Sequence, residues 1–493
     1  MTVDVRVFLT LSIGAAALAL LTRRDRRVTL VVGFGGLVGC ISAALLIDEA
    51  AAVNLLGGSL VSSPFLRWFL VVGSLAGLAA CLVALATRWQ PDLPAATLAA
   101  LGGGALALSI DALPIALLAA TAAGALGLIS LATPRSDPSD RRVMLAYLQG
   151  LVGAGTIAVV AAAWLVGPAG PLVFDTLAGG AAALAMALAL AIRLGAVPFH
   201  AAPARVVRAA VPLGIPLLLA WLPVLVFLVA LTWSHRILLG QAVDLGTVRV
   251  FVALVGAGSL LVGGMGTLGR PPESDDLHHV VSYGIVQDAG LFLLAFAAFD
   301  ASVWEAGRVW SLYFVVSKVG LTAWMAALIA VRGTALIEGL EGWARRSPLL
   351  AVGLVGAIAT GLGFPGLDSW DARLAIIQSA ADRPLRWIAY AGWALAYVPF
   401  IRVLWIGLRA AGPPLPIPAR VRVRFPPERP ERDARALVRY AFATAHLSRL
   451  AIAVLLALVV GLGGAFLAVG PTGLSEAAAI LPEPVLPPPS PGP

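Results

Sequence analysis

The 493-residue sequence is 60% hydrophobic and only 12% charged, whereas roughly a quarter of the residues of soluble domains are charged. This composition excludes a soluble enzyme and predicts an integral membrane protein that contacts the lipid bilayer. The formal net charge is +8, but the arginines occur in short clusters between apolar runs. They indicate membrane topology signals and no nucleic-acid-binding surface.

Fourteen apolar runs are long enough to cross a bilayer, since a helix of about 20 residues spans about 30 Å of hydrocarbon. The sequence therefore predicts an all-α, polytopic (multi-pass) membrane protein. The predicted spans are 7–22, 28–47, 68–87, 95–110, 113–131, 143–166, 177–197, 211–233, 248–268, 280–299, 309–331, 349–380, 385–408 and 450–469. Arginines follow the first span, which is the reverse of the charge order in a cleavable signal peptide, so we predict that this span is retained.

Arginine-rich connections follow the odd-numbered spans. These connections lie around residues 23–27, 88, 135–142, 205–208, 270, 332–346 and 402–439. Basic loops stay in the cytoplasm, so we expect a bacterial cell (inner) membrane protein with both termini outside the cytoplasm. Proline and arginine dominate 411–446, which predicts an extended cytoplasmic connection, and the proline-rich tail 471–493 is predicted to be disordered.

Two predicted spans contain a proline at which the helical hydrogen-bond ladder must break. Pro198 closes the seventh span, and Pro365 splits the twelfth. Backbone groups freed at membrane depth are tolerated only where they are buried or line a cavity. The two spans are five apart and cross the membrane in opposite directions, which is typical of inverted repeats with paired broken helices along an ion pathway. The alternative is that both prolines merely kink packed helices.

The only lysine of the chain, Lys318, lies near the middle of the apolar run Val309–Val331. An ammonium group at that depth costs about 2.5–3.5 kcal/mol even on a lenient scale, so we expect a polar partner or a water path. Asp288 lies about 12 Å into the antiparallel tenth span, at a similar depth. We predict a buried Asp288–Lys318 pair that acts as a switchable proton site. A static ion pair that aligns two helices is the alternative.

Two arginines lie close to the predicted breaks. Arg193 precedes Pro198 by five residues, and Arg373 follows Pro365 by eight. Arginine does not deprotonate in proteins, so these side chains can tune fields, bind anions or pair with acids, but they cannot relay protons. For Arg193 the alternative is a side chain that extends to the cytoplasmic interface.

Histidines and acids complete the candidate set. His278 and His279 open the tenth span at the cytoplasmic edge, where they either exchange protons or are simply solvated. Together with Lys318 and Asp288 they form the predicted proton relay. The remaining acidic candidates near the membrane are Asp111, Asp368 and Asp371.

Redox cofactors are not expected in this chain. Cys40 and Cys81 lie inside apolar runs, without a CxxC spacing or a nearby histidine that would suggest zinc, haem or an iron–sulfur cluster. No glycine-rich phosphate loop is followed by the expected lysine or acid, so we expect NADH to bind elsewhere. The sequence predicts neither a catalytic, a cofactor-binding nor a metal site here.

Several short motifs resemble one membrane protein family. They are Arg193–His200 (RLGAVPFH), His278–Tyr283 (HHVVSY), Ala344–Leu350 (ARRSPLL) and Gly363–Gly366 (GFPG). In order and spacing they resemble the antiporter-like membrane subunits of proton-pumping NADH:quinone oxidoreductase (complex I), and most closely subunit N. The resemblance covers roughly residues 96–408.

The resemblance implies a subunit of a membrane arm that couples quinone reduction to proton translocation. It implies two five-helix inverted repeats with broken seventh and twelfth helices, at 95–235 and 247–410. A three-helix segment at 1–94 precedes them, and the 411–446 connection, a transmembrane helix at 447–470 and the tail 471–493 follow. Flavin, iron–sulfur clusters, quinone and NADH are then expected on other subunits, and the other membrane-arm subunits are the expected partners.

The chain departs from the family pattern at several positions. The family has a key glutamate in the fifth span, and the matching position here is near Ala120. It has a lysine in the eighth span, and the matching position here is Val224. Where the family has a lysine in its seventh and twelfth broken helices, this chain has Arg193 and Arg373. Lys318 matches a lysine of the eleventh span in sister subunits. The first repeat thus lacks the titratable relay of the family, while the second keeps Lys318 with Asp288 near it. Three alternatives remain: a non-redox subunit with a reduced proton route, a non-conducting scaffold, or a subunit of a cation/proton antiporter or membrane-bound hydrogenase.

Overall fold

A computed structural model describes residues 2–49, 51–55, 58–87, 90–131, 138–167, 170–171, 175–238, 244–266, 268, 276–380 and 382–409. The predicted fourteenth span at 450–469, the 411–446 connection and the 471–493 tail lie outside the described residues.

The described chain is mostly helical, as predicted. The helices of the first half are α1 (Val5–Leu21), α2 (Arg26–Leu45), α3 (Pro64–Ala86), α4 (Leu93–Ser109), α5 (Leu113–Leu131), α6 (Pro138–Trp164), α7 (Thr176–Leu194), α8 (Ala201–Ala209) and α9 (Leu222–Trp233). Those of the second half are α10 (Gly246–Met265), α11 (Leu277–Ala297), α12 (Ala301–Arg332), α13 (Trp343–Arg346), α14 (Pro348–Leu362), α15 (Asp368–Ala380), α16 (Arg383–Leu395) and α17 (Tyr397–Leu408).

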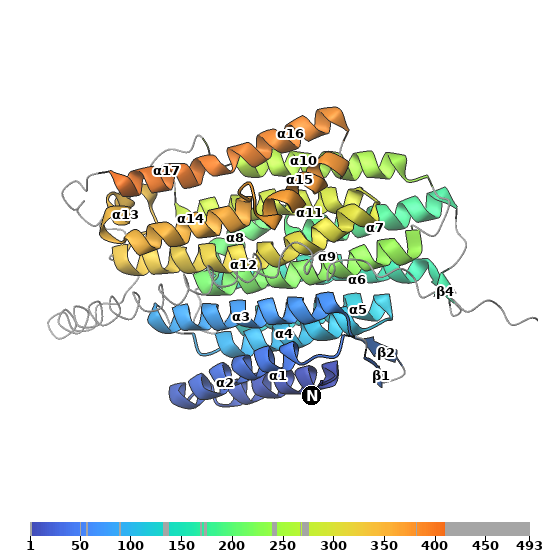
Figure 1. Cartoon of the computed structure of the whole chain (residues 1–493), viewed down its shortest axis with the longest axis horizontal. Coiled ribbons are helices and arrows are strands. Elements are labelled where there is room, and N and C mark those ends of the chain that lie inside the picture. The colour runs from blue at the N-terminus through green and yellow to red at the C-terminus, as the bar shows by residue number, and fades with distance from the viewer. Residues whose placement is uncertain are drawn as a thin grey trace, which may run out of the picture.

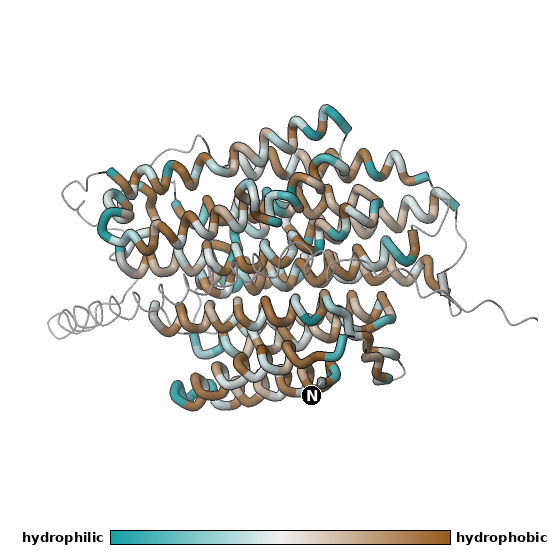
Figure 2. The backbone as a smooth tube through the Cα atoms, in the orientation of Figure 1, coloured by the Kyte–Doolittle hydropathy of each residue, from teal (hydrophilic) through white to brown (hydrophobic). Residues whose placement is uncertain are grey.

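The long helices lie side by side with roughly parallel axes, and α1 and α2 occupy one edge of the bundle while α16 and α17 occupy the opposite edge (Figure 1). Apolar residues cover most of the length of these helices, and hydrophilic residues gather mainly near their ends (Figure 2). Within the described residues ten helical segments are long and apolar enough to cross a membrane, and α1, α4 and α14 are shorter apolar helices. These features agree with a multi-pass membrane protein.

In the part of the chain that the structure describes, two short antiparallel hairpins connect helices. One joins β1 (Ala52–Leu55) to β2 (Gly58–Val61), and the other joins β3 (Val166–Gly167) to β4 (Gly170–Pro171).

Three predicted spans differ from the observed helices for local reasons. The eleventh begins two turns earlier than predicted, because Asp300 caps α12 by accepting a hydrogen bond from the Ser302 amide. The eighth is no uniform α-helix: a 3₁₀ turn (Pro212–Gly214), a π-helical turn η2 (Leu217–Trp221) and a π-helical end η3 (Ser234–Leu238) flank α9. Pro216 and Pro223 have no amide hydrogen for the α-helical ladder in this region.

The thirteenth span is divided between α16 and α17 at Ala396. Pro399, in the first turn of α17, lacks the amide hydrogen that would bond back to the preceding helix. Hydropathy alone gives one continuous run here, so it cannot detect this break.

Both proline-containing segments are discontinuous in the structure. Gly195 ends α7 with a left-handed backbone (φ 76°), and α8 begins at Ala201. The amide of Val197 in this break donates a hydrogen bond to Ser259 Oγ of α10, at 3.0 Å. Protein side chains therefore satisfy backbone groups that the break releases.

The second break separates α14 from α15, and Gly363 and Gly366 have positive φ angles of 84° and 92°. The indole of Trp393 donates to the Leu362 carbonyl at 2.6 Å, and the Tyr397 hydroxyl donates to the carbonyls of Leu362 and Gly363. Aromatic side chains of α16 and α17 thus replace the missing helical donors. This arrangement ends α14 inside the bundle and starts α15 with a new N-terminus.

Candidate functional site

Three charged side chains converge in the second half of the chain. Asp288 comes from α11, Lys318 from α12 and Arg373 from α15, and their exposed fractions are 1%, 5% and 0%. One carboxylate oxygen of Asp288 forms an ion pair with Lys318 Nζ, and the other forms an ion pair with Arg373 Nη2. Asp288 therefore lies between two cations in the protein interior. We call these three residues the buried charge cluster.

Close contacts between α10, α11 and α12 hold the residues of the cluster in place. Gly290 of α11 lies against α10, where an added Cβ would come within 2.4 Å of the Gly256 carbonyl oxygen. This contact leaves no room between the two backbones, and it holds α11 at a defined depth. On α12, Lys318 Nζ also lies 3.5 Å from the Gly284 carbonyl oxygen of α11 and donates to it.

Aromatic rings form the walls of the cluster. The guanidinium carbon of Arg373 lies 4.1 Å from the ring centre of Trp310 and 6.0 Å from that of Trp393. Lys318 Nζ lies 5.4 Å from the ring centre of Phe314. Such rings attract cations and exclude bulk water, so they stabilise two positive charges near one carboxylate.

The charges in the cluster do not cancel while Lys318 is protonated. Two cations and one carboxylate carry a net charge of +1, and loss of one proton from Lys318 brings the sum to zero. Arg373 stays charged, since arginine does not deprotonate in proteins. Asp288 consequently keeps a cationic partner in both protonation states of Lys318. This geometry permits one proton to be released and rebound without isolating a buried carboxylate.

The two predicted relay histidines lie at the start of α11, apart from the cluster. His279 is 3% exposed, and its Nε2 donates to the Gly266 carbonyl oxygen at 2.6 Å. Its ring centre lies 4.4 Å from that of Tyr283. His278 is half-buried. Nine residues separate His279 from Asp288, which is about 13.5 Å along the helix, so water or further side chains are needed between them.

Arg193 is buried in the first half of the chain and does not extend to the interface. It is 2% exposed, and its Nη2 donates to the Leu222 carbonyl oxygen at 3.4 Å. Its Nε and Nη1 have no hydrogen-bond partner among the described residues. The guanidinium fills the space beside Gly124, where an added Cβ would lie 2.8 Å from Nη2. The first half thus contains a buried cation for which the described residues supply no ion-pair partner.

The remaining acidic candidates lie outside the cluster. Asp368 opens α15 and accepts a hydrogen bond from the Tyr313 hydroxyl at 3.1 Å, and Asp371 is exposed one turn later. Asp111 pairs with Arg236 at the end of the bundle. Pro198 and Pro365 are both exposed within their breaks.

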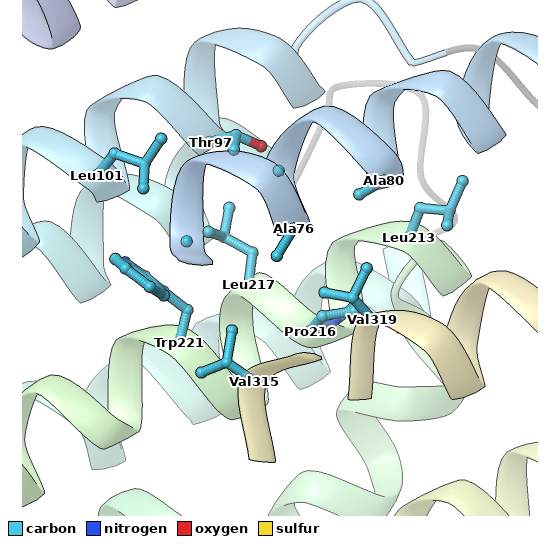
Figure 3. A pocket seen from close by; sticks show the side chains of 12 residues that line it. Ala76, Ala80, Thr97, Leu101, Leu213, Pro216, Leu217, Trp221, Val315 and Val319 are labelled. Atoms are coloured by element: carbon cyan, nitrogen blue, oxygen red, sulfur yellow. The ribbon is translucent and has the colours of Figure 1, made fainter. Parts of the chain in front are cut away.

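An apolar pocket lies between α3, α4, η2 and α12 (Figure 3). Val315 and Val319, the neighbours of Lys318 on α12, form part of its wall. Its polar side chains already have partners: the Thr97 hydroxyl donates to the Leu93 carbonyl, and the Trp221 indole donates to the Ala100 carbonyl. The pocket therefore offers no polar group for a proton path.

From the sequence, Arg373 is predicted only as a residue near the break and not as the partner of Asp288 that the structure shows. Trp310 and Tyr313 are not predicted either, because they look like ordinary aromatic residues of an apolar helix. One available signal was the position of Arg373 inside a short helix that begins at membrane depth, which places it near the level of Lys318.

Comparisons with known proteins agree with this architecture. Residues 122–398, more than half of the chain, match the family model described as NADH:quinone oxidoreductase/Mrp antiporter, TM. A curated relative, NADH-quinone oxidoreductase subunit N of Hydrogenovibrio crunogenus, is 23% identical over 216 residues, which cover 43% of this chain and 43% of that protein. The match therefore spans less than half of the relative.

Two solved structures resemble the whole chain in fold. A chain of the Mrp complex from Dietzia sp. DQ12-45-1b has a TM-score of 0.72 at 19% identity, and 96% of each chain is covered. A chain of respiratory complex I from Thermus thermophilus with bound NADH has a TM-score of 0.72 at 18% identity and covers 96% of this chain and 98% of that one. With the family match over residues 122–398, the chain belongs to the NADH:quinone oxidoreductase/Mrp antiporter transmembrane family.

Proposed function

We propose that this chain is a membrane-arm subunit of an NADH:quinone oxidoreductase-type complex and that it moves protons through Lys318. The observation that carries this proposal is the buried charge cluster, in which one titratable lysine and one permanent cation share Asp288. Family membership and the subunit N relatives support the type of complex. Electron donors, flavin, iron–sulfur clusters and quinone then belong to other subunits.

The proposed cycle uses the two protonation states of Lys318. A proton enters by way of His278 and His279 and reaches the neutral amine, which becomes an ammonium paired with Asp288. The cluster then carries one excess positive charge, whose burial is unfavourable at this depth. Release of the proton on the other side restores the neutral Asp288–Arg373 pair. Coupling to quinone reduction would require the neighbouring subunits to alter access to Lys318 on the two sides.

The proposed topology has fourteen spans and two inverted repeats, at 95–235 and 247–410. The two observed breaks, between α7 and α8 and between α14 and α15, support paired broken helices in the two halves. The distribution of arginine supports both termini outside the cytoplasm of a bacterial cell. In this scheme His278 and His279 face the cytoplasmic side.

The first repeat is proposed to be a poor proton conductor. Ala120 and Val224 are fully buried and cannot titrate, and Arg193 is a permanent cation at the end of α7. A buried positive charge repels both protons and metal cations. Transport is therefore assigned to the second repeat alone.

A cation/proton antiporter subunit is the second candidate function. The fold resembles the Mrp chain as closely as the complex I chain, with a TM-score of 0.72 in both cases. The genes next to this one would distinguish the two, because quinone-site and iron–sulfur subunits accompany a complex I and antiporter subunits accompany the other assembly.

The test is Lys318→Met in the assembled complex, reconstituted into liposomes. The variant leaves Asp288 paired with Arg373, so assembly is expected to survive. We expect the number of protons moved per electron to fall by the share that this subunit contributes. An unchanged ratio in an intact complex would favour a non-conducting scaffold.

A further inference from the structure

The hydrogen bond between Tyr313 and Asp368 connects the region of Lys318 with the start of α15. The Tyr313 hydroxyl donates to Asp368 Oδ2 at 3.1 Å, and Tyr313 is 4% exposed. The start of α12, at Ala301, and the end of α15, at Ala380, mark the same end of the bundle. Tyr313 is twelve residues from the first, and Asp368 is twelve residues from the second. Each is therefore about 18 Å from the same end of the bundle.

This end of the bundle is the one away from His278 and His279. Leu277, at the start of α11, donates its amide hydrogen to the Ala335 carbonyl just after α12, so these two ends lie together. The start of α12 is at the opposite end. From Lys318, Tyr313 lies five residues towards that opposite end, which is about 7.5 Å along the helix axis and about 140° around it.

Beyond Tyr313, the exposure of the side chains increases along this direction. Lys318 and Tyr313 are buried, Asp368 is half-buried and Asp371 is exposed at the surface of the chain. Asp368 and Asp371 are three residues apart on α15, so they occupy neighbouring positions on one helix face. The series leads from the buried lysine to the outside of the described chain, about 13.5 Å before the end of α15.

Arg373 cannot serve as this connection, although it contacts Asp288 directly, because a guanidinium does not release a proton. A phenol can pass a proton on, because its oxygen accepts one hydrogen bond while its hydrogen is donated in another. Among the described residues, the Tyr313 side chain of α12 has a hydroxyl that donates a hydrogen bond to an acid on a neighbouring helix, Asp368 of α15.

We propose that Tyr313, Asp368 and Asp371 carry the proton from Lys318 towards the end of the bundle away from His278 and His279. This inference rests on the proposed function of Lys318. The Lys318 ammonium gives a proton, through a chain of bridging waters, to the Tyr313 oxygen while the Tyr313 hydroxyl gives its own proton to the Asp368 carboxylate. Lys318 ends neutral, Tyr313 ends neutral and Asp368 ends as a carboxylic acid. Asp368 then passes the proton to Asp371, and water carries it over the remaining distance of about 13.5 Å to the end of α15.

A purely structural role makes different predictions. Two acids in the first turn of α15 stabilise its positive N-terminus, and the Tyr313–Asp368 bond clamps the break onto α12. Asp368→Asn separates the two roles, because an amide oxygen still accepts the Tyr313 hydrogen bond but does not take up a proton. Asp368→Glu restores a titratable group.

The experiment measures protons moved per electron in liposomes that contain the purified complex. The variants are Asp368→Asn, Tyr313→Phe and Asp368→Glu, with Lys318→Met as the reference. The control is Asp382→Asn, an exposed acid at the start of α16 whose side chain makes no capping bond. We expect Asp368→Asn and Tyr313→Phe to lose the same share of proton movement as Lys318→Met, Asp368→Glu to restore it, and Asp382→Asn to leave it unchanged.

Normal proton movement in Asp368→Asn, while Lys318→Met loses its share, would overturn this route and leave the role of Lys318 intact. Normal movement in Lys318→Met would overturn both proposals. If Tyr313→Phe fails to assemble because the clamp is lost, Asp368→Asn decides alone, since it keeps the clamp.

Discussion

At the scale of single residues, the buried charge cluster shows what sequence can and cannot predict. Lys318 and Asp288 lie on continuous antiparallel helices, so counting residues from the helix ends was enough to place them at one depth. Arg373 lies beyond a break of five residues with two positive φ angles, which resets the helix axis. Counting along the chain cannot follow such a break, and the third member of the cluster was therefore missed.

Charge balance predicts unequal costs for removing the members of the cluster. Asp288→Asn leaves two buried cations without a counter-charge, and we expect it to cost about 3–5 kcal/mol of stability. Lys318→Met leaves a neutral Asp288–Arg373 pair and is expected to cost much less. Thermal unfolding of the purified complex, followed by size-exclusion chromatography, measures both. Equal midpoints for Asp288→Asn and the parent protein would contradict the charge balance.

At the scale of helices, hydropathy predicts where the chain crosses the membrane, and proline predicts where two helices break. What hydropathy cannot supply is the packing between helices. In α10 and α11, glycines at positions 256, 263 and 290 let the two backbones touch. These residues look like unremarkable small residues in an apolar run, and only the structure shows which of them lie at the contact.

The contact between α10 and α11 predicts a contrast between two substitutions. Gly290→Ala places a Cβ within 2.4 Å of the Gly256 carbonyl oxygen, so the backbones must separate. We expect a cost of about 1–3 kcal/mol and a weaker hold on Asp288. The control, Gly258→Ala on α10, meets no atom within 4 Å and should be neutral or slightly stabilising. Thermal unfolding of the two variants makes the comparison, and equal midpoints would show that the helices can adjust.

The start of α12 predicts a dependence on pH outside the membrane. Asp300 accepts hydrogen bonds from the amide of Ser302 at 2.8 Å and from its hydroxyl at 2.6 Å, and these bonds lower the pKa of the Asp300 carboxyl. Its stabilising contribution is therefore present above the unfolded pKa of about 3.9 and is lost as the pH falls through the lower folded pKa.

We accordingly expect Asp300→Ala to cost about 1 kcal/mol near neutral pH. The cost should shrink as the pH falls below about 4, because the parent protein then loses the same cap. Asp300→Asn keeps an uncharged capping oxygen and serves as the control, with little change at either pH. Unfolding midpoints at pH 7 and pH 3.5 measure the difference. A cost that is equal at both values would show that the charge of Asp300 has no role in the cap.

At the scale of the whole molecule, the two halves of the chain share a discontinuous helix but differ in their ionisable groups. The first half contains the buried Arg193, for which the described residues supply no ion-pair partner, whereas the second contains the cluster of Asp288, Lys318 and Arg373. Composition was sufficient to predict a multi-pass membrane protein, and short motifs were sufficient to predict the family. The inequality of the halves followed from the residue types, but the way in which Arg373 completes the second half required the structure.

The proposed function depends on the ability of Lys318 to release a proton, and Lys318→Arg tests that ability most directly. Arginine keeps a cation beside Asp288 but does not deprotonate, so the charge of the site is retained while its titration is lost. The measurement is the number of protons moved per electron by the assembled complex in liposomes. We predict the same loss as in Lys318→Met, with assembly and electron transfer preserved. A ratio equal to that of the parent complex would contradict the proposed role of Lys318.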